Sequence, residues 1–174
     1  VIKNPNKSSI RKYTNKIDDQ ANENIMLNSF KNILPITSDK KRIFIEANVD
    51  TSEEVKDAYS KGIDGIGLFR SEYLYMNRKN LPTEEEQYSL IKKSLKALNK
   101  KTLTIRTLDI GNDKHIDSFD KLIAPSPNPA LGLRAIRLTL AFPKIFEKQI
   151  SAILRASFYG PIRIMLPMVS NVNE

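Results

Sequence analysis

Residues 62–72 read GIDGIGLFRSE, a short apolar run that is punctuated by glycines and ends abruptly in charge. An apolar run of this length between glycines is typical of a β-strand. Because side chains alternate along a strand, one face should carry an apolar row that ends in the guanidinium of Arg70. The two predicted faces are Ile66, Leu68 and Arg70, and Gly65, Gly67 and Phe69.

A second stretch further along the chain repeats this design. Residues 103–111 read LTIRTLDIG, so that Arg106 also follows an apolar run. One arginine after a strand usually forms a salt bridge at the rim of a sheet. Two arginines at the ends of parallel strands can clamp a small dianion, because a planar guanidinium binds phosphate or carboxylate bidentately. We therefore predict an anion site between Arg70 and Arg106.

The size and composition narrow the class of protein. The chain has 174 residues, enough for one domain with a hydrophobic core. It has no cysteine, no long apolar run and no charged-then-apolar leader, which argues within these residues against a disulfide scaffold, a membrane span and a secretory signal. We expect a cytoplasmic protein. The chain starts at Val1 and ends at Glu174 soon after a strand-like run, so we expect it to be part of a longer one.

The net charge of +8 raises the hypothesis of nucleic-acid binding. Lysine, asparagine and isoleucine are abundant together, as under a codon bias toward A and T, and the lysines are spread along the chain. No aromatic and basic pattern of an RNA-binding strand accompanies them. We therefore expect no nucleic-acid partner, and a non-catalytic basic binding module remains the alternative from another functional class.

The first 40 residues have the pattern of a linker. Residues 6–34 are polar and glycine-free, with apolar residues at helical spacing, which predicts an amphipathic helix that Leu34-Pro35 ends. Its apolar face is thin. A long helix with so little apolar surface is more typical of a connection between domains than of a core, so residues 1–40 are predicted to be a linker region.

Residues 41–174 show strands and helices in alternation. Strands are predicted at 41–49, 62–72, 102–108 and 162–168, and helices after Thr51 and Thr83 and at 131–141 and 144–158, the last two divided by Pro143. Capping boxes of Thr51 with Glu54 and of Thr83 with Glu86 should start the first two helices, and Gly62 should end the first.

This order predicts an α/β fold with parallel strands and right-handed crossovers. Four β/α units occupy about 130 residues, and a (β/α)8 barrel of eight units needs ~250. The chain is therefore predicted to be a linker helix followed by the first half of a TIM barrel.

Four stretches also carry a family resemblance: GIGLFRSEYLYMNRKNLPTEEEQ, TIRTLDIGNDK, NPALGLRAIR and AILRASFYGPIRIMLPMVSNVNE. They resemble the first half of the phosphoenolpyruvate-binding barrel of enzyme I, the phosphoenolpyruvate-protein phosphotransferase of the sugar phosphotransferase system. The resemblance covers the whole chain, and residues 1–40 are similar to the segment that joins the family's phosphohistidine domain to its barrel. Phosphoenolpyruvate synthase and pyruvate phosphate dikinase share the barrel and remain alternatives, although LPTEEEQ is the enzyme I form.

The resemblance implies site residues. The family's two phosphoenolpyruvate-binding arginines fall on Arg70 and Arg106, and Arg134 resembles a further basic residue near the phosphate, with Arg137 as a neighbour that could instead serve a salt bridge. Three more residues are candidates to support these arginines: Asp109, Lys114 and Asn48.

Two residues depart from the family motifs. Ser71 replaces a threonine and keeps the hydroxyl, and Asn112 replaces a glycine. Asparagine tolerates positive φ better than most residues, so the loop can keep its backbone geometry. The asparagine side chain, however, is expected to hinder the close approach of this loop to a substrate.

The resemblance also implies a reaction and its partners. Enzyme I transfers the phosphoryl group of phosphoenolpyruvate to its own histidine with Mg²⁺ and then to a small histidine-containing carrier protein, and it acts as a homodimer. The acceptor histidine, the metal ligands and the proton-donating cysteine are all expected outside this chain. His115 lacks the context of the acceptor, and no pair among Glu46, Glu72 and Asp109 has spacing that demands a metal.

We therefore predict that the isolated chain does not turn over phosphoenolpyruvate. A phosphoryl acceptor, a metal and a proton donor each supply several kcal/mol of transition-state stabilisation, and all three are expected elsewhere. The measurement is pyruvate release by the purified chain with Mg²⁺, beside a complete enzyme I as positive control. Release above the protein-free background would contradict the prediction.

Overall fold

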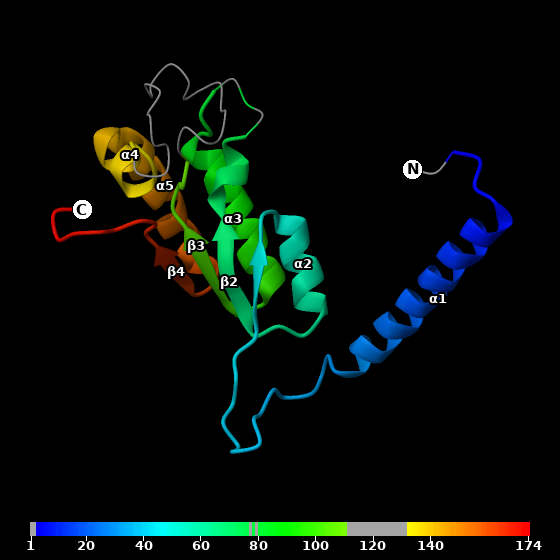
Figure 1. Cartoon of the computed structure of the whole chain (residues 1–174). Helices are drawn as coiled ribbons and strands as arrows, with labels where there is room; N and C mark the ends of the chain where they lie inside the picture. The colour runs from blue at the N-terminus through cyan, green and yellow to red at the C-terminus, as the bar shows by residue number, and fades with distance from the viewer. Residues whose placement is uncertain (1–2, 77, 79, 111–131) are drawn as a thin grey trace. The chain divides into compact units, whose positions relative to one another are not determined.

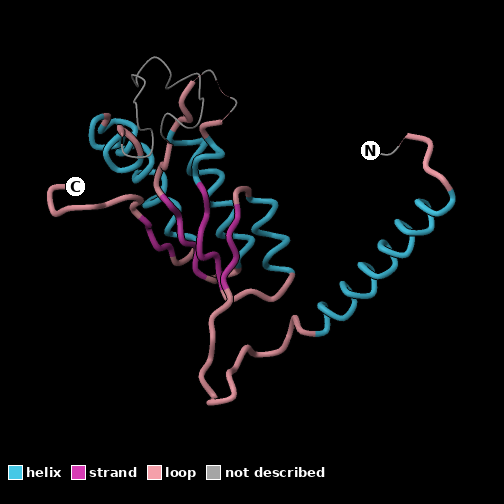
Figure 2. The backbone as a smooth tube through the Cα atoms, viewed as in Figure 1, coloured by secondary structure: helices cyan, strands magenta, loops and turns pink. Residues whose placement is uncertain are grey.

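The computed structural model describes residues 3–76, 78, 80–110 and 132–174 (Figures 1 and 2). It divides into two compact units, residues 1–43 and residues 44–174. This division lies close to the boundary after residue 40 that the sequence suggests. The function of the first unit as a linker stays a prediction.

The first unit contains one helix, α1 (Lys7–Ser29), in its described part. Asn6 starts it by accepting a hydrogen bond from the backbone N of Ser9 at 2.8 Å. No residue of α1 is buried, in keeping with its thin apolar face. The predicted end at residue 34 is wrong, because the backbone N of Phe30 already bonds to Leu27 in a tighter turn and no buried contact stabilises a longer helix.

The second unit is an α/β structure with a parallel sheet. Its strands are β1 (Glu46–Val49), β2 (Gly65–Arg70), β3 (Thr102–Arg106) and β4 (Ile162–Met165), in the spatial order β1-β2-β3-β4. All three pairings are parallel (Figure 1). The connections hold α2 (Ser52–Ser60), α3 (Glu84–Leu98), α4 (Ala135–Ala141) and α5 (Pro143–Ala156), with the short 3-10 helices η1 (Ser71–Leu74) and η2 (Ser157–Tyr159). The predicted class and strand order are confirmed.

Several predicted boundaries are wrong by a few residues. The first strand begins at Glu46 rather than at 41, because Arg42 forms a bridge with Ile36 in the preceding segment. The fourth strand ends at Met165, two residues before Pro167, which cannot donate to a ladder. The predicted division of two helices near Pro143 is confirmed, but Pro143 is itself the first residue of α5, since proline lacks the N–H that this helix position leaves unused.

The core lies between the sheet and three helices. Figure 1 shows α2, α3 and α5 along the sheet, and their buried apolar residues form one cluster with those of the strands. The predicted apolar stripe of α3 is confirmed, since Ile91, Leu95 and Leu98 are all buried in this cluster. One face of the sheet is therefore covered by helices, and the strand residues that alternate with the core lie on the other face.

The predicted alternation along β2 is wrong at one point. Ile66 and Phe69 were expected on opposite faces, yet both are buried in the helix-side core. Ile66 pairs with Leu103 and Phe69 with Ile105, so β2 uses one residue more than β3 over this stretch. A bulge of this kind reverses the alternation after it. Arg70, next to Phe69, consequently belongs to the face that the helices leave open.

The capping box of α3 is present as predicted. Thr83 Oγ1 accepts from the backbone N of Glu86 at 3.2 Å, and the Glu86 carboxylate accepts from the backbone N of Thr83 at 2.7 Å. At α2 the box is only half formed. Thr51 accepts from the backbone N of Glu54, but the Glu54 carboxylate accepts from the backbone N of Asp50 instead of Thr51. Gly62 follows α2 with a φ of 88°, which suits the glycine that ends a helix.

The Glu86 cap predicts an acid-dependent loss of stability. The hydrogen bond from the backbone N of Thr83 is the first cause that holds the pKa of Glu86 below its usual range. A lowered folded-state pKa gives stability that is complete above the unfolded value of about 4.3 and is lost as the pH falls through the folded value. Glu86→Gln keeps the cap without a titrating group. We expect the melting temperature of this variant to change less than that of wild type between about pH 5 and pH 3. If the melting temperatures of both proteins fall in parallel with pH, Glu86 is not the source of the acid-dependent loss.

Candidate functional site

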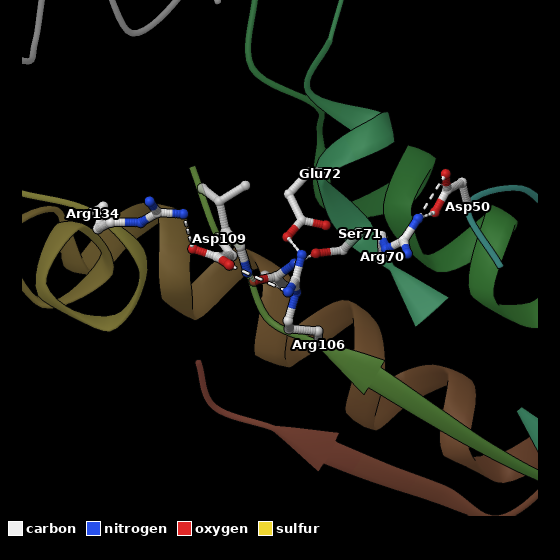
Figure 3. Close-up of polar contacts among 9 residues, drawn as sticks. Asp50, Arg70, Ser71, Glu72, Arg106, Asp109 and Arg134 are labelled. Atoms are coloured by element: carbon white, nitrogen blue, oxygen red, sulfur yellow. Dashed lines mark hydrogen bonds and ion pairs between the residues drawn. The ribbon is translucent and has the colours of Figure 1, made fainter. Parts of the chain in front are cut away.

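Two arginines lie side by side at the carboxyl ends of neighbouring strands. Arg70 is the last residue of β2 and Arg106 the last residue of β3, and they are direct partners in the parallel register. The convergence predicted from the sequence is therefore confirmed. A third arginine, Arg134, lies at the start of α4. Figure 3 shows Arg134 and Arg106 joined through Asp109, and Arg70 in a separate contact with Asp50.

Arg106 is held by two carboxylates. Its Nη2 lies 2.5 Å from Glu72 Oε1, and its Nη1 lies 3.3 Å from Asp109 Oδ2 (Figure 3). The Glu72 side chain is only 3% exposed, so this ion pair is largely withdrawn from water. A guanidinium has five N–H donors, so these contacts orient Arg106 and leave donors for a ligand.

Two buried atoms of this pair have no hydrogen-bond partner in the described part of the chain. They are Arg106 Nε and Glu72 Oε2. Buried polar atoms in folded proteins almost always have a partner. Both atoms belong to the ion pair that orients Arg106 beside the predicted anion site.

Asp109 joins Arg106 to Arg134. Its Oδ2 faces Arg106, and its Oδ1 lies 3.0 Å from Arg134 Nη2. The structure thus brings together Asp109 and Arg134, two of the residues that the sequence suggested near the arginines. Arg137 is engaged elsewhere, with Nε 2.8 Å from Glu174 Oε1, and this guanidinium lowers the pKa of Glu174 to about 2. Of the two arginines left open by the sequence, Arg134 is the one connected to the site.

Arg70 has a more open environment. Its Nη1 contacts both carboxylate oxygens of Asp50, at 3.0 and 3.3 Å, and the two side chains are 46% and 37% exposed. Asp50 directly follows β1, so it lies at the same edge of the sheet as the arginines. Sequence reasoning missed Asp50, although its place one residue after a strand is the same signal that identified Arg70.

The remaining predicted residues lie elsewhere. Lys114, Asn112 and His115 are outside the described residues. Asn48 is exposed on β1 two residues before Asp50, and among the described contacts it does not join the arginine network. Its support of the arginines stays a prediction.

A second ion pair crosses the open face of the sheet. Glu46 on β1 pairs with Arg163 on β4, past the two strands between them. Glycines make room for the Glu46 side chain: a Cβ at Gly67 would lie 3.1 Å from Glu46 Cβ, and a Cβ at Gly65 would lie 3.2 Å from Glu46 Oε1. The glycine punctuation of β2 thus has a spatial cause, which the sequence alone did not reveal.

The described residues do not offer a magnesium site. They contain no group of three or more His, Cys, Asp or Glu side chains that could hold a metal ion. The three carboxylates at the strand ends are each engaged by an arginine: Asp50, Glu72 and Asp109. Within the same described part, no helix is long and apolar enough to cross a membrane.

The family model for the phosphoenolpyruvate-binding domain of PEP-utilising enzymes matches residues 25–174. The chain belongs to this family. Its arginine-ended strands are thus those of a PEP-utilising domain, and the resemblance seen in the sequence motifs is confirmed.

Curated relatives of this PEP-utilising domain share one name, phosphoenolpyruvate-protein phosphotransferase. The chain is 38% identical over all 174 residues to the one from Priestia megaterium and 40% identical over the same length to the one from Staphylococcus epidermidis. It is 40% identical over 171 residues to the one from Buchnera aphidicola subsp. Baizongia pistaciae. The chain spans 29 to 30% of the length of these relatives.

The different burial of the two carboxylate partners predicts different costs of removing their charge. Glu72→Gln leaves Arg106 in a buried site with one carboxylate fewer, and we expect the free energy of unfolding to fall by about 1 to 3 kcal/mol. Asp50→Asn disrupts an exposed pair and should cost about 0 to 1 kcal/mol. Urea denaturation of both variants checks this, and equal losses would refute the ranking.

Proposed function

We propose that this chain is the phosphoenolpyruvate-binding part of a phosphoenolpyruvate-protein phosphotransferase. Such an enzyme transfers the phosphoryl group of phosphoenolpyruvate to its own histidine and then to a small histidine-containing carrier protein. The observation that carries the proposal is the register pairing of Arg70 with Arg106 at the ends of two parallel strands. Relatives of that name, 38 to 40% identical over the chain, support it.

The arginines match the chemistry of the substrate. Phosphoenolpyruvate carries a phosphate and a carboxylate, and an arginine fork can bind either group with two parallel hydrogen bonds. Arg106 and Arg134 are already oriented by Asp109, so their donors need little rearrangement when an anion binds. Preorganised charges of this kind stabilise the negative charge of a phosphoryl group during transfer.

Arg70 is suited to exchange its partner. Its contact with Asp50 is half exposed, and an exposed ion pair contributes only about 0 to 1 kcal/mol. A phosphate or carboxylate oxygen can therefore replace Asp50 at little cost. Arg70 then acts as the adjustable member of the clamp, beside the fixed Arg106.

We further propose that residues 44–174 are four β/α units of a (β/α)8 barrel and that residues 1–43 hold a linker. The sequential order of four parallel strands and the arginines at their carboxyl ends support a barrel, in which sites gather at that end. Mg²⁺ would neutralise phosphoryl charge when bound, but the described carboxylates do not fit it, so its ligands are proposed outside these residues. A homodimer and a cytoplasmic location complete the proposal.

Substitution of the clamp arginines tests the proposed function in the complete gene product that carries this chain. Arg70→Lys and Arg106→Lys keep the charge but lose the forked contact. A charge-assisted hydrogen bond is worth ~1.5 to 3 kcal/mol, so we expect the catalytic efficiency with phosphoenolpyruvate to fall roughly tenfold to a few hundredfold. The melting temperature should change little for Arg70→Lys, whose ion pair is exposed.

The matched control is Arg11→Lys on α1, which should leave transfer and melting unchanged. Full transfer activity in both clamp variants would show that the substrate binds other residues. Wild-type protein that binds polynucleotide with a steep salt dependence, and does not bind phosphoenolpyruvate, would favour the basic binding module instead.

A further inference from the structure

A buried glutamine on the helix side of the sheet reaches the candidate site. Gln149 of α5 is only 1% exposed. Its Nε2 donates to Ser71 Oγ at 3.0 Å, and its Oε1 accepts from the backbone N of Leu108 at 3.0 Å. A buried amide is costly unless it is hydrogen-bonded, so these two contacts account for a polar residue on an otherwise apolar helix face.

The two contacts fall at corresponding places in the chain. Ser71 directly precedes Glu72, and Leu108 directly precedes Asp109. Glu72 and Asp109 are the two carboxylates that hold Arg106 (Figure 3). Gln149 therefore binds the residue before each carboxylate that orients this guanidinium.

Hydrogen bonds of the sheet do not join the segments that carry Glu72 and Asp109. The register of β2 with β3 ends at Arg70 and Arg106. After it the two segments separate: Ser71 enters η1, and the backbone N of Thr107 bonds to the carbonyl of Met165, the last residue of β4. Across this separation Gln149 spans from Ser71 to Leu108 with one side chain.

We propose that Gln149 is a positioning residue for Arg106. By holding Ser71 and Leu108 at a set spacing, it holds Glu72 and Asp109 where both can bind the guanidinium. It touches no substrate and acts only through these neighbours. The inference rests on the proposed function, because it assigns Gln149 to the phosphoenolpyruvate clamp.

The decisive variant is Gln149→Met in the complete gene product. Methionine has a similar length and fills the same space, but it leaves the Leu108 N–H without an acceptor and Ser71 without a donor. We expect kcat/KM for phosphoenolpyruvate to fall about tenfold, with the larger part of the loss in KM, since Arg106 contacts the substrate before and during transfer. The matched control is Gln87→Met. Gln87 on α3 is also buried, but its side chain bonds to Tyr75 Oη and not to Ser71 or Leu108.

A second pair of variants keeps the test decisive if Gln149→Met does not fold. Ser71→Ala removes one of the two contacts, and Ser71→Thr retains the hydroxyl. We expect Ser71→Ala to raise KM severalfold and Ser71→Thr to restore most of the loss. If Gln149 acts in packing alone, these variants should lower the melting temperature without raising KM more than they lower kcat.

Amide hydrogen exchange gives a readout that does not depend on activity. The Leu108 amide should exchange faster in Gln149→Met than in wild type, while Gln87→Met should leave it protected. If the wild type is active and Gln149→Met has the same kcat/KM as Gln87→Met, this inference is overturned and the proposed function still stands. Wild type without phosphoenolpyruvate-dependent transfer would overturn both, even if the exchange result confirmed the hydrogen bond.

Discussion

The site depends on one constraint, the parallel pairing that ends with Arg70 beside Arg106. Neighbouring strands lie only about 4.8 Å apart, so two cations are brought together at one edge of the sheet. Two cations that lie near each other repel, and nearby anions offset this repulsion. The carboxylates of Asp50, Glu72 and Asp109 meet this need, and an anionic substrate carrying two acidic groups can meet it as well.

The two arginines satisfy this constraint in different ways. Arg106 is fixed by carboxylates that are themselves largely buried, whereas Arg70 has one partner in an exposed pair. A fixed group provides preorganised charge for phosphoryl transfer. An exposed group can exchange its partner at low cost and follow the substrate. For the proposed phosphoenolpyruvate clamp, this combination suits a binding step that is followed by transfer and release.

Both faces of the sheet contribute to this arrangement. The helix side supplies the apolar core and also Gln149, whose amide reaches the segments after β2 and β3. The open side carries the Glu46–Arg163 pair over the glycines of β2. A change in the core at α5 can therefore alter the site without touching a ligand, because a close-packed interior transmits small displacements.

Local features of this protein could be predicted from its sequence: the α/β order, the arginine at the end of each of two strands, the α3 capping box and the family motifs. They could be predicted because alternation, helical spacing and capping depend on residues a few positions apart. Tertiary structure alone decided the β2 bulge and the partners of each charge. The bulge depends on the register with β3, and the contacts of Arg70 with Asp50 and of Gln149 with Ser71 join residues 20 and 78 positions apart. No periodic pattern encodes such distances, since only packing brings these side chains together.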